Sequence, residues 1–187
     1  MISIEEKFEL AQKRFEDPSF LSNKGLGNEV GIHVFEYEPT DELKIREFIK
    51  QLKSWEVHKP YRLIHFDLYE IFIEISKKFD IYEDNKENEE MFGSAELLKN
   101  FGTVLGPKEY IKIIDKEKFQ SNRDIVLISG VGRVYPMMRA HLILNNIHHI
   151  FKEVPVVLFY PGIYDGQSLI LFGKFFEDNY YRAFSLI

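Results

Sequence analysis

The sequence contains no cysteine, which excludes disulfide bonds, thiolate metal ligands and cysteine nucleophiles. It also lacks any apolar run approaching the roughly 20 residues that a membrane-spanning helix needs. Residues Met1–Arg14 mix acidic and basic side chains, unlike a secretory signal peptide. We therefore expect a cytoplasmic protein with no membrane partner.

Basic charge is in short supply, with 24 Lys and Arg residues against 30 Asp and Glu and a net charge of −6. Because a general nucleic-acid surface needs a positive field, this balance argues against direct DNA binding. The length of 187 residues and a hydrophobic content of 45% indicate one α/β domain over residues 1–187 with a core of its own. The 17 Phe and 10 Tyr residues fill that core, and a substantial aromatic interface is the alternative use for some of them.

Strand patterns and helix patterns alternate along the chain. Strands are expected at 32–37, 61–67, 124–129 and 155–160. Helices are expected at 3–16, from an N-cap at Thr40 or Asp41 to about 52, and at 68–79, 94–119 (two short ones) and 136–151. This alternation predicts an α/β fold with a mostly parallel central sheet of four to five strands and helices on both faces. Strands 124–129 and 155–160 are almost continuously apolar, as central parallel strands should be. Residues 168–172 are a candidate antiparallel edge strand near the C-terminus.

The turn after the third strand, Gly130–Pro136, has the composition of a ligand-binding turn. Glycine permits left-handed backbone angles and close approach, and Pro136 suits the first position of a helix. The first-turn amides, together with Arg133 and Arg139, would suit a phosphate or carboxylate. The turn nevertheless lacks a third glycine, and the chain has no Walker pattern. A bare strand-to-helix connection, an anion site and a partner-docking surface therefore all stay open.

Other polar residues have ordinary structural explanations beside functional ones. Asp67 ends the second strand, where a carboxylate can bind Mg²⁺, act as a base, or cap the next helix. Asp165, within Tyr164–Gln167, faces the same choice and fits ordinary turn chemistry. His141 and His148 are too far apart on their helix to share one metal ion. We predict no metal site, no cofactor and no catalytic residue.

Five segments together resemble the BrxB family of the BREX (bacteriophage exclusion) defence systems: residues 25–35, 130–141, 154–162, 164–169 and 179–184. The resemblance implies a cytoplasmic component of an anti-phage system with no established catalytic activity. It further implies a PglZ-like partner, together with other BREX components, and support for host DNA methylation and phage restriction. In one respect the chain departs from the family pattern, which would place an arginine at Ile170.

These observations lead to two hypotheses. The first is a non-enzymatic interaction and assembly protein that docks through loops at the carboxyl ends of the strands. The second is a degenerate P-loop-like nucleotide- or anion-binding domain that uses the Gly130–Arg139 turn. The candidate residues for either role are Gly130, Gly132, Arg133, Tyr135, Arg139, Asp67, Tyr164, Asp165, Tyr180 and Arg182.

Overall fold

The computed structural model describes residues 2–23, 31–81, 83, 85–147, 150–176 and 183–187. The strands are β1 (Ile32–Tyr37), β2 (Arg62–Asp67), β3 (Asp124–Ser129), β4 (Val156–Tyr164), β5 (Leu169–Leu171), β6 (Phe175–Phe176) and β7 (Ala183–Ser185). The α-helices are α1 (Ile4–Phe15), α2 (Pro18–Leu21), α3 (Glu42–Trp55), α4 (Leu68–Lys78), α5 (Asn85–Phe92), α6 (Ser94–Val104), α7 (Pro107–Ile114), α8 (Val131–Val134) and α9 (Ala140–Ile147). Two 3-10 turns, Pro39–Asp41 and Glu56–His58, flank α3.

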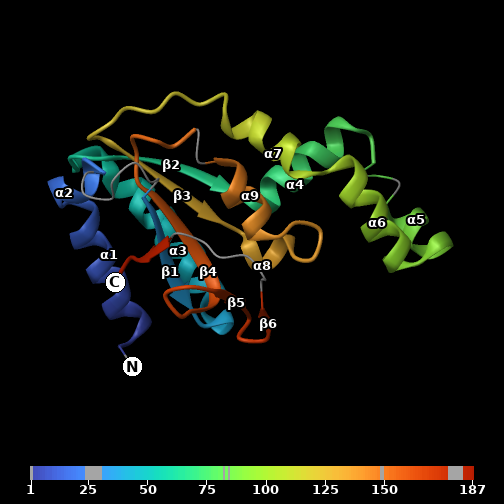
Figure 1. The fold of residues 1–187 in the computed structure, drawn as a ribbon, viewed down its shortest axis with the longest axis horizontal. Coiled ribbons are helices and arrows are strands. Elements are labelled where there is room, and N and C mark those ends of the chain that lie inside the picture. Colours follow the sequence, from blue (N-terminus) through green and yellow to red (C-terminus); the bar gives the residue numbers. More distant parts are fainter. Residues whose placement is uncertain (1, 24–30, 82, 84, 148–149, 177–182) are drawn as a thin grey trace.

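The central sheet has the order β2-β3-β4-β1-β7, and every pairing along this path is parallel (Figure 1). The predicted α/β fold with its mostly parallel sheet is therefore confirmed. The expected antiparallel strand is also present, because β5 pairs antiparallel with β4 and β6 then pairs with β5. Since the parallel strands run in one direction, their carboxyl ends share one edge of the sheet.

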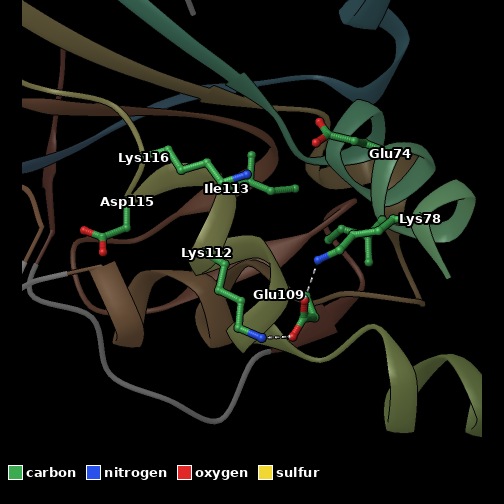
Figure 2. A pocket seen from close by; sticks show the side chains of 8 residues that line it. Glu74, Lys78, Glu109, Lys112, Ile113, Asp115 and Lys116 are labelled. Carbon is green, nitrogen blue, oxygen red and sulfur yellow. Dashed lines mark hydrogen bonds and ion pairs between the residues drawn. The ribbon is translucent and has the colours of Figure 1, made fainter.

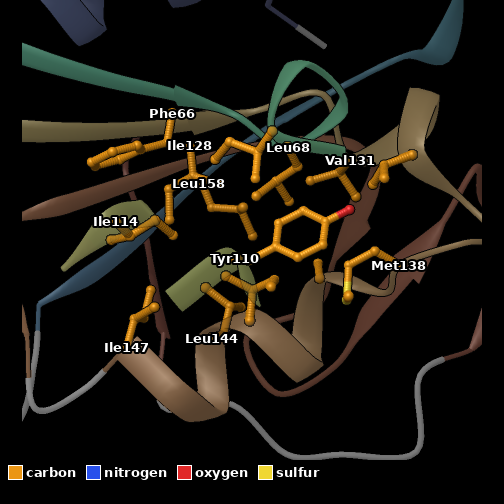
Figure 3. Close-up of a cluster of buried hydrophobic side chains, with 14 of the residues drawn as sticks. Phe66, Leu68, Tyr110, Ile114, Ile128, Val131, Met138, Leu144, Ile147 and Leu158 are labelled. Carbon is orange, nitrogen blue, oxygen red and sulfur yellow. The ribbon is translucent and has the colours of Figure 1, made fainter. Parts of the chain in front are cut away.

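Helices cover both faces of the sheet, and each face has its own hydrophobic cluster. All six residues of β3 are buried. Ile125 and Leu127 belong to the cluster covered by α1, α2 and α3. Val126 and Ile128 point the other way, into the cluster formed with α4, α7, α8 and α9, where Tyr110 is fully buried (Figure 3). A strand buried on both sides explains why its sequence does not alternate.

The prediction of a single helix over 136–151 is wrong. The chain instead forms the one-turn helix α8 directly after Gly130, then a connection through Pro136, and then α9. Tyr135 adopts an extended conformation with ψ of 138°. Because a residue that precedes proline is disfavoured in the α region, Tyr135 ends α8. Pro136 lies in the connection and does not begin a helix.

The acidic segment after residue 80 contains α5, which lies with α6 at one end of the molecule, away from the sheet (Figure 1). The hydrophobic residues Met91 and Phe92 at the end of α5 are exposed. Within the described residues, none of the helices has both the length and the apolar character required to cross a bilayer.

Candidate functional site

The carboxyl ends of β2 and β3 bring Asp67 and Ser129 side by side, because the two residues are partners in the parallel register. The Asp67 carboxylate caps α4: its Oδ1 atom accepts hydrogen bonds from the backbone N–H groups of Tyr69 (3.0 Å) and Glu70 (3.2 Å). Such a cap satisfies amides that the first turn of a helix leaves without partners. Asp67 therefore has a structural role at the very position where a metal or a catalytic base had been considered.

Arg133 extends from α8 into a ring of carboxylates. Its Nη2 atom forms an ion pair with Asp67 Oδ2, its Nη1 atom lies 3.5 Å from Glu70 Oε1, and its Nε atom lies 3.9 Å from Glu42 Oε1. The guanidinium also stacks 5.0 Å from the centre of the Tyr69 ring, and only 21% of its side chain is exposed. Because three acidic groups surround this arginine, its charge is already satisfied within the protein. These contacts argue against anion binding at the Gly130–Arg139 turn.

Both glycines of the turn are explained by close packing. Gly130 has φ of +77°, and a Cβ atom there would lie 2.3 Å from Asp67 Oδ1. At Gly132 a Cβ would lie 2.9 Å from the Phe172 ring and 3.1 Å from Pro161. The turn therefore fits between the α4 cap on one side and the β4–β5 hairpin on the other. This geometry corresponds to the interpretation of the turn as a tight strand-to-helix connection.

Tyr135 faces the hairpin. Its ring centre lies 6.1 Å from that of Phe172 and 5.3 Å from that of Phe175. Arg139 is exposed in the connection that leads to α9, whereas Arg133 is held by Glu42, Asp67 and Glu70. The two arginines that appeared to belong to one site therefore have different environments.

Tyr164 and Asp165 stabilise the hairpin itself. The Tyr164 hydroxyl donates a 2.5 Å hydrogen bond to the carbonyl of Ala183 in β7. Asp165 Oδ1 accepts from the N–H groups of Gln167 (2.8 Å) and Ser168 (2.6 Å), and these backbone hydrogen bonds hold the pKa of the carboxyl below its usual range. Asp165 is thus a turn residue. Tyr180 and Arg182 lie outside the described residues.

One face of the hairpin is apolar and exposed, a feature that the sequence reasoning missed. Ile163, Ile170 and Phe176 are direct cross-strand partners on β4, β5 and β6. Cross-strand partners project from the same face of a sheet, so these side chains form one row. Ile163 is 49% exposed and Phe176 is 69% exposed. We call these three residues the hairpin face; the run of apolar residues 169–171 was the available signal.

A cleft of about 280 Å³ opens between α3 and the carboxyl ends of β2 and β3. Its lining residues are Arg46, Ile49, Lys50, Lys53, His65, Asp67, Glu70, Ser129 and Arg133. At its floor the Oγ atom of Ser129 and the Nε2 atom of His65 are 2.7 Å apart. Burial lowers the pKa of His65 to about 4, so this imidazole is neutral at physiological pH. We call this feature the α3 cleft.

A second hollow, between α4 and α7, has a different character (Figure 2). Its volume is about 400 Å³, but Glu109 lies 3.7 Å from Lys78 and 2.5 Å from Lys112. Three of the charged residues that line this hollow therefore pair with one another. In the part of the chain that the structure describes, no three His, Asp or Glu side chains cluster closely enough to hold a metal ion.

Comparison with known proteins identifies close relatives. The family model described as "BREX protein BrxB" matches residues 64–186. A Bacillus cereus (strain H3081.97) protein named "BREX protein BrxB" is 39% identical over 194 residues, which cover 100% of this chain and 99% of that protein. An Escherichia coli O9:H4 (strain HS) protein of the same name is 29% identical over 184 residues, covering 98% and 92% of the two chains. No solved structure is significantly similar to the chain.

Proposed function

Because the chain belongs to the BrxB family of BREX proteins, we propose that it is a non-enzymatic assembly component of a BREX anti-phage complex. In this role it binds a PglZ-like protein and so supports host DNA methylation and phage restriction. Its relatives' shared name places the family in the BREX system. The binding role itself is inferred from the surface of this chain.

The observation that carries the proposal is the hairpin face. Ile163, Ile170 and Phe176 place aliphatic and aromatic area in one row, and Ile163 and Phe176 at its two ends are exposed. Buried aromatic and aliphatic anchors dominate the energy of protein interfaces. Contiguous apolar side chains on the outside of a soluble domain are typical of a docking surface.

The hairpin face rests on a rigid support. On the opposite side of β5, Leu169 and Leu171 are almost completely buried in the main core. β5 pairs with Gly162–Tyr164, the end of β4 that extends beyond its parallel pairing with β1. Gly162 allows the close approach because a Cβ there would lie 2.1 Å from the carbonyl oxygen of Ile170. A preformed surface of this kind loses little conformational entropy on binding.

The polar groups at the carboxyl edge support a binding role rather than catalysis. Asp67 accepts the hydrogen bonds that cap α4 and forms an ion pair with Arg133, and Arg133 also forms an ion pair with Glu70. An acid, base or oxyanion-stabilising group must be available to a substrate. Here the groups with suitable chemistry bond to one another.

The test is co-purification of tagged protein with a PglZ-like protein from the same BREX system. Phe176→Asp places a charge on the most exposed residue of the hairpin face, and we expect retention of the partner to fall at least about tenfold. Val57→Asp is the matched control, because Val57 is 79% exposed in the 3-10 turn after α3 and lies outside the hairpin face. Circular dichroism should show both variants folded. Equal retention by both variants, or no capture by the unmodified protein at low salt, would contradict the proposal.

A further inference from the structure

We propose that the α3 cleft binds the phosphate group of a small phosphorylated molecule. This site lies apart from the hairpin face and uses residues that the proposed assembly role does not need. It also differs from the glycine turn considered above, because its cations come from α3 and not from α8.

The first observation is a row of cations on α3. Arg46, Lys50 and Lys53 follow the i, i+4, i+7 spacing that places side chains on one face of a helix, and all three line the cleft. None of the three forms an ion pair with any residue in the described part of the chain. By contrast, Lys44 on the same helix pairs with Glu5 (3.0 Å) and Asp41 (3.4 Å). Uncompensated cations in an acidic protein raise the local affinity for anions.

The carboxylates of the cleft cancel only part of this charge. Asp67 and Glu70 are the acidic residues among its lining, and both are engaged by Arg133 at the rear wall. Asp67 also accepts the two amide hydrogen bonds of the α4 cap. The lining therefore carries four cations against two carboxylates, and the three on α3 are the ones left for a ligand.

The floor of the cleft supplies neutral hydrogen-bonding groups. Ser129 is 5% exposed, and the Ser129 hydroxyl and the His65 imidazole are paired at the ends of β3 and β2. Polar side chains at these two positions interrupt an otherwise apolar sheet face beneath α3. In open α/β sheets, ligands bind outside the carboxyl ends of the strands, and this pair lies at that edge.

The size and lining of the cleft define the class of ligand. A volume of about 280 Å³ is near the lower end for small-molecule sites. No Phe, Tyr or Trp is among its described lining residues, so the cleft offers no platform on which a base could stack. The recognised group is therefore the phosphate. Pyrophosphate and a nucleoside monophosphate should bind with similar affinity, whereas the nucleoside alone should not bind.

The experiment is calorimetric titration of the full chain at low salt with pyrophosphate, AMP, adenosine and a short single-stranded DNA. We expect pyrophosphate and AMP to bind, and a Lys50→Gln/Lys53→Gln variant to bind both at least about tenfold more weakly, as expected for lost charge-assisted hydrogen bonds. These residues are exposed, so the variant should fold. Lys44→Gln is the control, because it removes an equivalent charge from α3 outside the cleft.

Three results would overturn the proposal. One is the absence of heat from both phosphate compounds. A second is equal weakening by Lys44→Gln and by the single variant Lys50→Gln, which would indicate a general charge effect. The third is binding of the oligonucleotide alone, which would assign the cations to nucleic acid. The Lys50→Gln/Lys53→Gln variant should still retain a PglZ-like partner, so failure here and failure of the assembly role can be told apart.

Discussion

Substitution of Gly130 by alanine tests the close contact between residue 130 and Asp67 at the carboxyl ends of β2 and β3. The backbone at Gly130 is left-handed, with φ of +77°, and a Cβ atom would lie 2.3 Å from the Oδ1 atom of Asp67. Asp67 must therefore move. Its carboxylate caps α4 and pairs with Arg133, so the displacement affects both interactions.

The expected cost has three parts. Holding alanine in a left-handed conformation costs about 1 kcal/mol. Loss of the side-chain cap of α4 costs about 1 kcal/mol. Weakening of the largely buried pair between Asp67 and Arg133 adds about 1–2 kcal/mol, because each group would keep its charge with a poorer partner. We therefore expect Gly130→Ala to lower the free energy of unfolding by about 3–4 kcal/mol.

The measurement is equilibrium urea unfolding followed by circular dichroism. Gly166→Ala is the matched control: Gly166 has φ of +90°, but a Cβ there meets nothing within 4 Å. That variant should lose about 1 kcal/mol, from the backbone alone. The two substitutions thus share the conformational cost and differ in the contacts of the new Cβ atom, of which the one with Asp67 is the shortest.

A double-mutant cycle isolates the contact. In an Asp67→Ala background the 2.3 Å contact is absent and the 3.1 Å contact with the Tyr69 backbone nitrogen remains, so Gly130→Ala should cost clearly less than it does in the unmodified protein. If Gly130→Ala and Gly166→Ala are equally destabilising in the unmodified protein, the reasoning about the carboxyl edge is refuted. An unchanged cost of Gly130→Ala in the Asp67→Ala background would refute it as well.

Two further predictions concern stability. Burial lowers the pKa of both His33 and His65 to about 4 from an ordinary 6.5, so the unfolded chain binds protons more readily than the folded one. The stability present above pH 6.5 should therefore fall as the pH drops toward 4, by about 3 kcal/mol per histidine. In urea unfolding across that range, the midpoints of His33→Phe should decline less steeply than those of the unmodified protein. Tyr110 is fully buried, its hydroxyl has no hydrogen-bond partner among the described residues, and burial raises its pKa. Tyr110→Phe should therefore leave the free energy of unfolding unchanged or raise it by about 1 kcal/mol. A loss above about 1 kcal/mol in urea unfolding would show that the hydroxyl does have a hydrogen-bond partner.

Much of the architecture follows from local pattern. The β1 and β3 strands begin and end at the predicted residues, 32–37 and 124–129, because β-branched and apolar residues there are bounded by turn and charged residues. The 136–151 segment shows the limit of such reasoning. Its apolar spacing was compatible with a helix from Pro136 to Phe151, but the structure places residues 136–139 in a connection and the helix α9 only at Ala140–Ile147.

The candidate site was less accessible from the sequence. Arg133 and Asp67 were recognised separately, yet their pairing depends on β2 and β3 being neighbours, which strand order alone decides. The hairpin face needed the cross-strand register of β4, β5 and β6. The α3 cleft needed the placement of α3 over the ends of strands that follow it in the chain.

By itself, the sequence determined the alternation of strands and helices, the parallel sheet and the family resemblance, because periodicity and local steric preferences act over a few residues. Only the tertiary structure decided which charges meet. Arg133 is held by carboxylates from α3, β2 and α4, whereas Lys50 and Lys53 have no such partners among the described residues. The physical reason is that electrostatic partners are chosen by distance in space, and the packing of distant segments sets that distance.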